Sequence, residues 1–161
     1  AQTWFTLYSA SMANHHERNF RNLYMSEKKH LAVEANKNSI RYAMEGNKEA
    51  WLALYAEDAV VADPVGVSPM DPTGEGHHGK AAIEKFWDTI IGPANLDIRV
   101  DKRWTSGEHC CCVAQVARSD MGDGKYTECD MLAVYEVNEE GLITRMQAHW
   151  NFDELMAQLA V

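Results

Sequence analysis

The stretch GNKEAWLALYAEDAVVADPVG, residues 46–66, decides how this chain is expected to fold. Its first glycine is expected to end one helix, and Asn47 is placed to cap the next. Apolar residues then recur with helical spacing as far as Tyr55, which predicts a short amphipathic helix. A brief strand is predicted over 58–63. The stretch therefore predicts a helix, a sharp stop and a strand in immediate succession.

The strand delivers one carboxylate, Asp63, directly before a proline and after the apolar run 59–62. This position predicts that the carboxyl group emerges from the protein interior. A carboxyl group in apolar surroundings has a raised pKa and can act as a base toward carbon acids near neutral pH. An aspartate before a proline is also common in plain turns, so a purely structural role stays open.

The flanking sequence predicts helices first and strands afterwards. Residues 26–45 have helical composition with Ser26 as the N-cap, and 80–91 form a third helix with its apolar residues on one side. Strands are predicted over 96–100, 108–118, 126–137 and 142–151, followed by helical spacing over 152–159. This order predicts an α+β fold, in which a cone-shaped, curved antiparallel sheet carries helices on its concave face and leaves a pocket between them.

Two segments fit this pattern less well. Residues 1–24 lack a steady period and are expected to be an N-terminal extension, or translation from upstream of the true start, which places the functional domain at 25–161. Residues 64–79 hold three of the four prolines and are expected to form a long loop, either a lid or a solvated insertion. The His77-His78 pair falls in this loop, without a partner at metal-ligand spacing.

Composition limits the classes of partner. The chain of 161 residues is 46% hydrophobic and carries a net charge of −9. Its lysines and arginines cluster no further than pairs, which argues against nucleic acid and anionic membrane as partners. No apolar run reaches the ~20 residues that span a bilayer, and the first residues lack the features of a signal peptide. We expect a cytoplasmic protein with a small apolar ligand and without a cofactor or metal.

The four cysteines support the same compartment. Cys110, Cys111 and Cys112 are consecutive, so on a strand they point to alternating faces and cannot close around one metal ion. We interpret them as small apolar side chains of a reducing cytosol. A disulfide from Cys129 to the neighbouring strand stays open.

Three segments together resemble the bacterial ketosteroid isomerases of the nuclear transport factor 2-like superfamily, which also contains polyketide-cyclase-like proteins. They are the opening stretch with its YAEDAxxxDPxG frame, the segment EEGLITRMQAHWN, and the third helix with GKAAI and Phe86-Trp87. The resemblance covers about residues 26–157. It implies that Asp63 shuttles a proton alpha to a ketone, and that Trp150 is a pocket tryptophan.

In the same family a tyrosine and a protonated aspartic acid hold the negative oxygen formed during the reaction. The tyrosine position here holds Ser39, and the acid position holds Ala133. Tyr42 lies almost one helical turn beyond Ser39, and Tyr55 is a further candidate donor. Asp130 is three residues from Ala133, and an odd offset on a strand places it on the opposite face.

Strand alternation supplies the remaining candidates. Met131, Ala133 and Tyr135 share one face, and Met146 and Trp150 share another that is expected to line the same cavity. The full set of candidate ligand-binding residues is Ser39, Tyr42, Tyr55, Phe86, Trp87, Met131, Ala133, Met146 and Trp150, with Asp63 as the candidate catalytic residue. Glu136, Arg145 and His149 fall on the outer sheet face, where we expect a homodimer to form.

Three functions remain open. The first is a ketosteroid-isomerase-like proton transfer on a small apolar, steroid-like carbonyl compound, with Asp63 as the base. The second is a polyketide-cyclase-like or dehydratase-like enzyme on the same fold, with Tyr42 or Tyr55 as a catalytic partner of Asp63 within hydrogen-bond reach. The third is a binding protein for steroid or polyketide-like molecules without chemistry, which the replaced oxyanion residues favour, since losing one donor typically costs roughly 10²–10³ in turnover.

Overall fold

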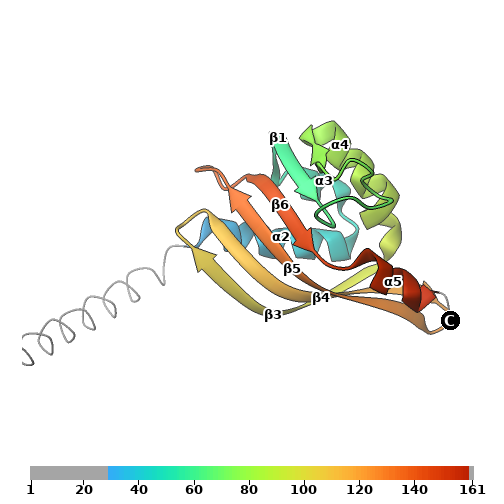
Figure 1. Cartoon of the computed structure of the whole chain (residues 1–161). Coiled ribbons are helices and arrows are strands. Elements are labelled where there is room, and N and C mark those ends of the chain that lie inside the picture. The colour runs from blue at the N-terminus through green and yellow to red at the C-terminus, as the bar shows by residue number, and fades with distance from the viewer. Residues whose placement is uncertain (1–28, 160–161) are drawn as a thin grey trace, which may run out of the picture. The chain divides into compact units, whose positions relative to one another are not determined.

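The computed structural model describes residues 29–159, which form a six-stranded curved sheet with helices on one face (Figure 1). The strand order is β2-β1-β6-β5-β4-β3. In chain order the elements are α2 (Leu31–Glu45), α3 (Lys48–Leu52), β1 (Tyr55–Ala62), β2 (His77–His78), α4 (Gly79–Phe86), β3 (Leu96–Ser106), β4 (Cys110–Gly122), β5 (Lys125–Val137), β6 (Ile143–His149) and α5 (Phe152–Leu159). The extension over 1–24 and the Ser26 cap lie outside the described residues.

The predicted α+β class and curved sheet are confirmed, with one correction. Strands β3 to β6 form the expected antiparallel meander, but β1 pairs with β6 in the parallel sense, so the sheet is mixed. The reason is topological, because β1 follows α2 and α3, precedes the meander in the chain and lies beside the last strand of the meander. This parallel pair brings the end of β1, and with it Asp63, next to the end of β6.

The opening stretch folds nearly as predicted. The Asn47 side chain accepts a hydrogen bond of 3.1 Å from the amide of Ala50, which confirms it as a helix cap. The strand begins at Tyr55, however, and not at residue 58. The amide of Ile143 donates to the carbonyl of Leu54 at 2.7 Å, so pairing with the neighbouring strand starts directly after the helix. Tyr55 therefore belongs to β1, which corrects its assignment to the preceding helix.

Two further boundaries differ from the prediction. His77 and His78 form a two-residue strand against Val61 and Val60, because β1 offers them an unpaired edge, so the loop ends before them. The third helix comprises α4 and a π-helical continuation over Trp87–Ile91. The strands β5 and β6 and the terminal helix lie close to their predicted positions. The strands β3 and β4 are longer than predicted, because they pair with each other as far as Ser106 and β4 continues to Gly122.

The core lies between the sheet and the helices on its concave face. Helix α2 packs across β3, β4 and β5, while α4 covers β1 (Figure 1). Fully buried side chains from both layers interlock there, among them Ala32, Trp51, Tyr55, Ile83, Phe86, Val113 and Ile143. Within residues 29–159, no helix has both the length and the apolar character needed to cross a membrane.

Candidate active site in the cavity beneath the helices

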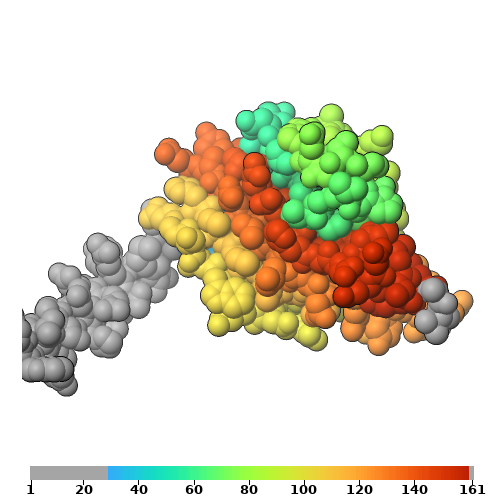
Figure 2. Space-filling view, viewed as in Figure 1, coloured from blue at the N-terminus to red at the C-terminus, as the bar shows by residue number. Residues whose placement is uncertain are grey.

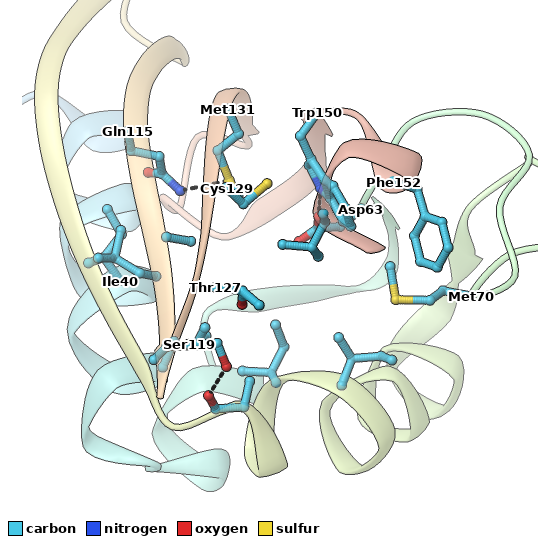
Figure 3. Close-up of a pocket in the computed structure, with 18 of the residues that line it drawn as sticks. Ile40, Asp63, Met70, Gln115, Ser119, Thr127, Cys129, Met131, Trp150 and Phe152 are labelled. Carbon is cyan, nitrogen blue, oxygen red and sulfur yellow. Dashed lines mark hydrogen bonds between the residues drawn. The ribbon is translucent and has the colours of Figure 1, made fainter. Parts of the chain in front are cut away.

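Asp63 is held at the point where β1 ends beside β6. The amide of Val65 donates to the carbonyl of Ala148 at 2.8 Å, so main-chain pairing with β6 continues past Asp63. The indole Nε1 of Trp150 donates to Asp63 Oδ1 at 2.5 Å, and the two side chains meet at the cavity (Figure 3). The carboxyl group is therefore both placed and oriented by tertiary contacts.

The environment of Asp63 raises its pKa above the ordinary value for an aspartate. Burial is the larger cause, because the carboxylate loses solvation inside the apolar cavity. The hydrogen bond from Trp150 acts in the opposite sense, since it stabilises the ionised form. Asp63 keeps partial exposure through the cavity, so a ligand can reach its carboxyl group.

The cavity has a volume of about 580 Å³ and a mostly apolar lining. That volume lies within the range of sites for drug-sized molecules, roughly 300–1,000 Å³. Its polar side chains are few, and they include Ser39, Asp63, Gln115, Thr127 and Tyr135. In Figure 3, Gln115 and Asp63 extend toward the cavity from different strands, with Met131 and Cys129 between them.

Five of the predicted site residues meet at this cavity. Asp63, Ser39, Met131, Met146 and Trp150 all line it. They come from α2, β5, β6 and the ends of β1 and β6, elements that are far apart in the sequence.

The other predicted residues lie outside the cavity wall. Phe86, Trp87 and Ala133 are buried within the hydrophobic core. Tyr42 is turned toward Arg41, whose guanidinium donates to the tyrosine hydroxyl at 2.8 Å. Tyr55 is fully buried and does not line the cavity; its hydroxyl lies beside that of Ser39 but makes no hydrogen bond of good geometry within the described part of the chain.

Asp130 and the predicted outer-face residues lie where strand alternation places them. Asp130, Glu136, Arg145 and His149 are all exposed. In the described part of the chain, the hydrogen bond to Asp63 comes from Trp150, and neither Tyr42 nor Tyr55 supplies it.

At one end of the cavity, several side chains with hydrogen-bond donor groups lie close together. Trp51 Nε1 donates to Ser39 Oγ at 3.1 Å, and the hydroxyl of Tyr135 lies 3.5 Å from the same oxygen. Ser39, Trp51 and Tyr135 all line the cavity and are buried, and we call these three residues the deep end. Burial raises the pKa of Tyr135 to about 12, so its hydroxyl stays protonated at neutral pH.

The opposite end is apolar. Met121, Met156 and Leu159 line the cavity and are themselves 56%, 37% and 47% exposed, so the cavity meets solvent there; we call these three residues the open end. Helix α5 is fastened beside it by a pair of hydrogen bonds between Gln158 and the backbone of Glu128, at 2.7 and 2.9 Å.

Sequence reasoning missed several lining residues. Gln115 interrupts the buried alternation Cys111, Val113, Gln115 on β4, and a polar residue at such a position is the signal that identifies it. The methionine of the long loop, Met70, also lines the cavity. Its loop is ordered by Asp71, which accepts hydrogen bonds from Thr73 and Gly76.

The described residues, 29–159, contain no cluster of three or more His, Cys, Asp or Glu side chains that would hold a metal ion. All four cysteines are free, Cys129 included. The acid-base groups that line the cavity are the carboxyl group of Asp63, the thiol of Cys129 and several hydroxyls; burial raises the pKa of Cys129 to about 12, so this thiol is protonated at neutral pH.

Comparison with known proteins identifies relatives of the whole folded region. The model of the SnoaL-like domain matches residues 38–146. A steroid Δ-isomerase of Nocardioides simplex is 32% identical over 105 residues, which is 65% of this chain and 77% of that protein.

Two solved structures share both fold and sequence with the chain. A Δ5-3-ketosteroid isomerase from Mycobacterium sp. is 35% identical with a TM-score of 0.73, covering 78% of this chain and 96% of its own. A Mycobacterium tuberculosis protein in complex with estradiol-17β-hemisuccinate is 34% identical with a TM-score of 0.73, covering 78% and 97%. The coverage shows that the likeness extends over nearly the entire relatives.

Proposed function

The chain belongs to the SnoaL-like domain family, and from that premise we propose that it is a ketosteroid-isomerase-like enzyme with Asp63 as its base. The reaction is the intramolecular transfer of a proton from the carbon next to a carbonyl group to another carbon of the same molecule. One observation carries the proposal: a single carboxyl group with a raised pKa faces an apolar cavity of ligand size. Such a group has the base strength that the removal of a carbon-bound proton requires.

Each part of the Asp63 site has a role in this chemistry. The ionised carboxylate removes the proton, and the electrons of the broken C–H bond form a carbon–carbon double bond while the carbonyl oxygen becomes negative. The carboxylic acid then returns the proton to a different carbon and the carbonyl group is restored. The Trp150 N–H fixes the orientation of the carboxyl group and limits the rise in its pKa, so that a useful fraction is ionised.

The shape and lining of the cavity support a rigid apolar ligand, which we propose is steroid-like. Its wall consists largely of aliphatic, thioether and aromatic side chains. One structural relative was determined with estradiol-17β-hemisuccinate. A fused-ring ketone would exclude water from Asp63, which strengthens the electrostatic interactions at the reacting atoms.

Replacement of Asp63 tests the proposal. With an unconjugated steroid ketone as substrate, formation of the conjugated ketone is followed by its ultraviolet absorbance. Asp63→Asn is expected to lower turnover by at least about 10²-fold, in line with loss of a general base, while steroid affinity is retained. The matched control is Asp130→Asn, which changes an exposed carboxyl group on the outer face and should leave turnover unchanged. Turnover that survives in Asp63→Asn would remove Asp63 from the mechanism.

A specific observation favours a second candidate, a steroid-binding protein without turnover. Ala133 occupies the position of the family's neutral acid, and it is buried in the core. This candidate predicts tight steroid binding without exchange of the ketone's alpha protons in deuterated water. Detectable exchange in wild type that disappears in Asp63→Asn would decide for the enzyme.

We also propose that the protein forms a homodimer through the outer face of its sheet. Apolar side chains gather there on adjacent strands: Trp104 and Leu132 are 44% and 48% exposed, beside Cys112, Ala114 and Val134. Figure 2 shows this face, with β3 to β6 side by side in yellow through red, while Figure 1 places α2 on the far side. Charged Glu136 and Arg145 border the apolar group, as at the rim of many interfaces.

Light scattering on the full chain tests the dimer. Leu132→Arg is expected to shift the protein to monomer by placing a charge in the apolar group. Val67→Arg is the control, because Val67 is 76% exposed in the loop after β1. A wild-type protein that stays monomeric at all concentrations would exclude the dimer.

A further inference from the structure

The hydroxyl groups of Ser39 and Tyr135 at the deep end have more hydrogen atoms to donate than the hydrogen bonds between them use. The indole of Trp51 can only donate, and it gives its hydrogen to Ser39 Oγ. Ser39 must therefore direct its own hydrogen elsewhere. Two tyrosine hydroxyls lie near it: that of Tyr135 at the long distance of 3.5 Å, and that of Tyr55, whose pKa is raised by burial and lowered to a smaller extent by interaction with Ser39. The contact from Tyr135 to Ser39 is long and weak, and Tyr135 lines the cavity, so its hydroxyl hydrogen is available to a ligand oxygen.

A third hydroxyl strengthens this surplus. The Tyr55 hydroxyl is fully buried and makes no hydrogen bond of good geometry in the described part of the chain; burial and the nearby Tyr135 raise its pKa, and the neighbouring Ser39 hydroxyl lowers it. Buried polar groups are normally paired, and an unpaired one destabilises the folded protein. A group of donors with too few acceptors is suited to an incoming acceptor oxygen, such as that of a carbonyl group.

Tyr135 lies on the strand that carries the vacant acid position. It is two residues beyond Ala133 on β5, so both side chains point to the same face of the sheet. Its neighbour across the sheet is Met146 on β6, which in turn pairs with Val61, two residues before Asp63. The charge of Asp63 also contributes to raising the pKa of Tyr135, which requires the two groups to be near each other. A ligand oxygen bound at the deep end would thus lie near Asp63, in the same site.

We infer that Tyr135, together with Ser39, is the donor pair that binds the ligand's carbonyl oxygen and stabilises its negative charge while Asp63 holds the proton. The inference rests on the proposed function of Asp63 and supplies the oxyanion site that Ala133 lacks. Removal of the alpha proton moves the C–H electrons into the adjacent carbon–carbon bond, which becomes a double bond, and moves the carbonyl π electrons onto oxygen. Tyr135 and Ser39 keep their own protons and only donate hydrogen bonds. The ligand class is therefore an apolar molecule with a ketone or phenol oxygen at one end.

Binding of 2-naphthol tests the donor pair without turnover. Ionised and neutral naphthol absorb at different wavelengths, so the ionised fraction of the bound molecule reports how strongly its oxygen is stabilised. Tyr135→Phe is expected to weaken binding by at least about tenfold and to lower the ionised fraction, while Ser39→Ala has a smaller effect in the same direction. Tyr126→Phe is the matched control, because Tyr126 is 47% exposed on the same strand. Equal affinity and ionised fraction in wild type and Tyr135→Phe would overturn the inference.

A measurement on wild-type protein covers the case in which a variant does not fold. The infrared carbonyl stretch of a bound steroid ketone should shift to lower frequency than in an apolar solvent, because the donor pair polarises the bond. An unshifted stretch would overturn the inference independently of any substitution.

The outcome is separable from that of the proposed function. Asp63→Asn removes the base but leaves both hydroxyls in place, so naphthol binding should persist. If Asp63→Asn stops turnover while Tyr135→Phe changes neither naphthol binding nor turnover, the assignment of Asp63 as the base is retained and the donor pair is rejected. If Asp63→Asn leaves turnover intact while Tyr135→Phe weakens naphthol binding, the donor pair is retained as part of the ligand-binding site and the proposed reaction is rejected.

Discussion

The deep end and the open end of the cavity differ in both chemistry and packing. At the deep end Ser39, Trp51 and Tyr135 are buried and linked through Ser39 Oγ. At the open end Met121, Met156 and Leu159 are partly exposed and offer only apolar surface to the cavity. The first end has fixed directions for polar groups, while the second consists of flexible side chains that adapt to shape.

This difference suggests how one cavity can be selective for the position of a ligand oxygen and tolerant of the shape of the rest of the ligand. A ligand oxygen is recognised only where donors are held rigidly, because a misplaced donor contributes little to binding or to charge stabilisation. The remainder of the ligand needs only apolar surface. We therefore expect changes at the deep end to affect folding and chemistry strongly, and changes at the open end to affect mainly the range of ligands.

The largest effect on stability is expected from Trp51→Ala. Trp51 is 2% exposed and packs against Tyr55 and Trp87, with ring centroids 4.5 and 5.0 Å away. Truncation leaves a large void and also removes the N–H that fixes Ser39, so we expect a loss of about 3–5 kcal/mol in the free energy of unfolding. Urea unfolding measures it. A loss below about 1 kcal/mol would show that the deep end is not a rigid anchor.

The next effect concerns the pH dependence of stability. The folded-state pKa of Asp63 lies above its unfolded value, so ionisation costs more in the folded protein. Its favourable contribution is therefore fully present below the unfolded pKa and is lost as the pH rises through the raised folded pKa. Asp63→Asn should remove this loss and stabilise the protein near neutral pH, on the order of 1 kcal/mol. Thermal unfolding at several pH values checks it, and the same difference between variant and wild type at all pH values would contradict it.

A smaller gain is expected from Gln115→Leu, in the cavity lining outside both ends. The amide oxygen of Gln115 is buried without a partner in the described part of the chain, and its nitrogen contacts only the sulfur of Met131, at 3.3 Å. Replacing the amide by an apolar group of similar volume should raise stability by up to about 1 kcal/mol. Gln115→Asn is the matched comparison, since it keeps the amide and should not stabilise. A clear destabilisation by leucine would indicate that ordered water satisfies the amide.

The smallest effect is expected from Met156→Ala at the open end. Met156 is 37% exposed on α5, so its truncation should cost no more than about 0.5 kcal/mol in the free energy of unfolding. Binding of a bulky steroid should change only a few-fold, and the ionised fraction of bound naphthol should not change. Isothermal titration with both ligands makes the comparison. A loss of naphthol ionisation would mean that the two ends are coupled.

Most of the fold was predictable because its signals are local. The strand ends fall at turn residues, Asn47 caps a helix, and alternating apolar residues mark β4, β5 and β6. The parallel pairing of β1 with β6 was not predictable in this way. It depends on which strand of the meander lies beside β1 in the folded domain, and no local sequence pattern specifies that neighbour.

The same distinction between local sequence signals and tertiary contacts applies to the residues of the candidate site. Asp63 and Trp150 were identified from the sequence, and Met131 and Met146 followed from strand parity. Tyr42 was a reasonable candidate from helical spacing, but its hydroxyl accepts a hydrogen bond from Arg41 instead.

The sequence alone determined the kind of fold, the position of a carboxylate after an apolar strand, and the presence of Ser39 and Ala133 at the two positions where the resemblance implies oxyanion donors. Only the tertiary structure decided that Tyr135 meets Ser39, that Trp150 orients Asp63, and that α5 borders the open end. The physical reason is that spacing along a chain fixes which face a side chain occupies. Which groups share a cavity depends on how the sheet curves and how its strands pair, and those are properties of the whole packed domain.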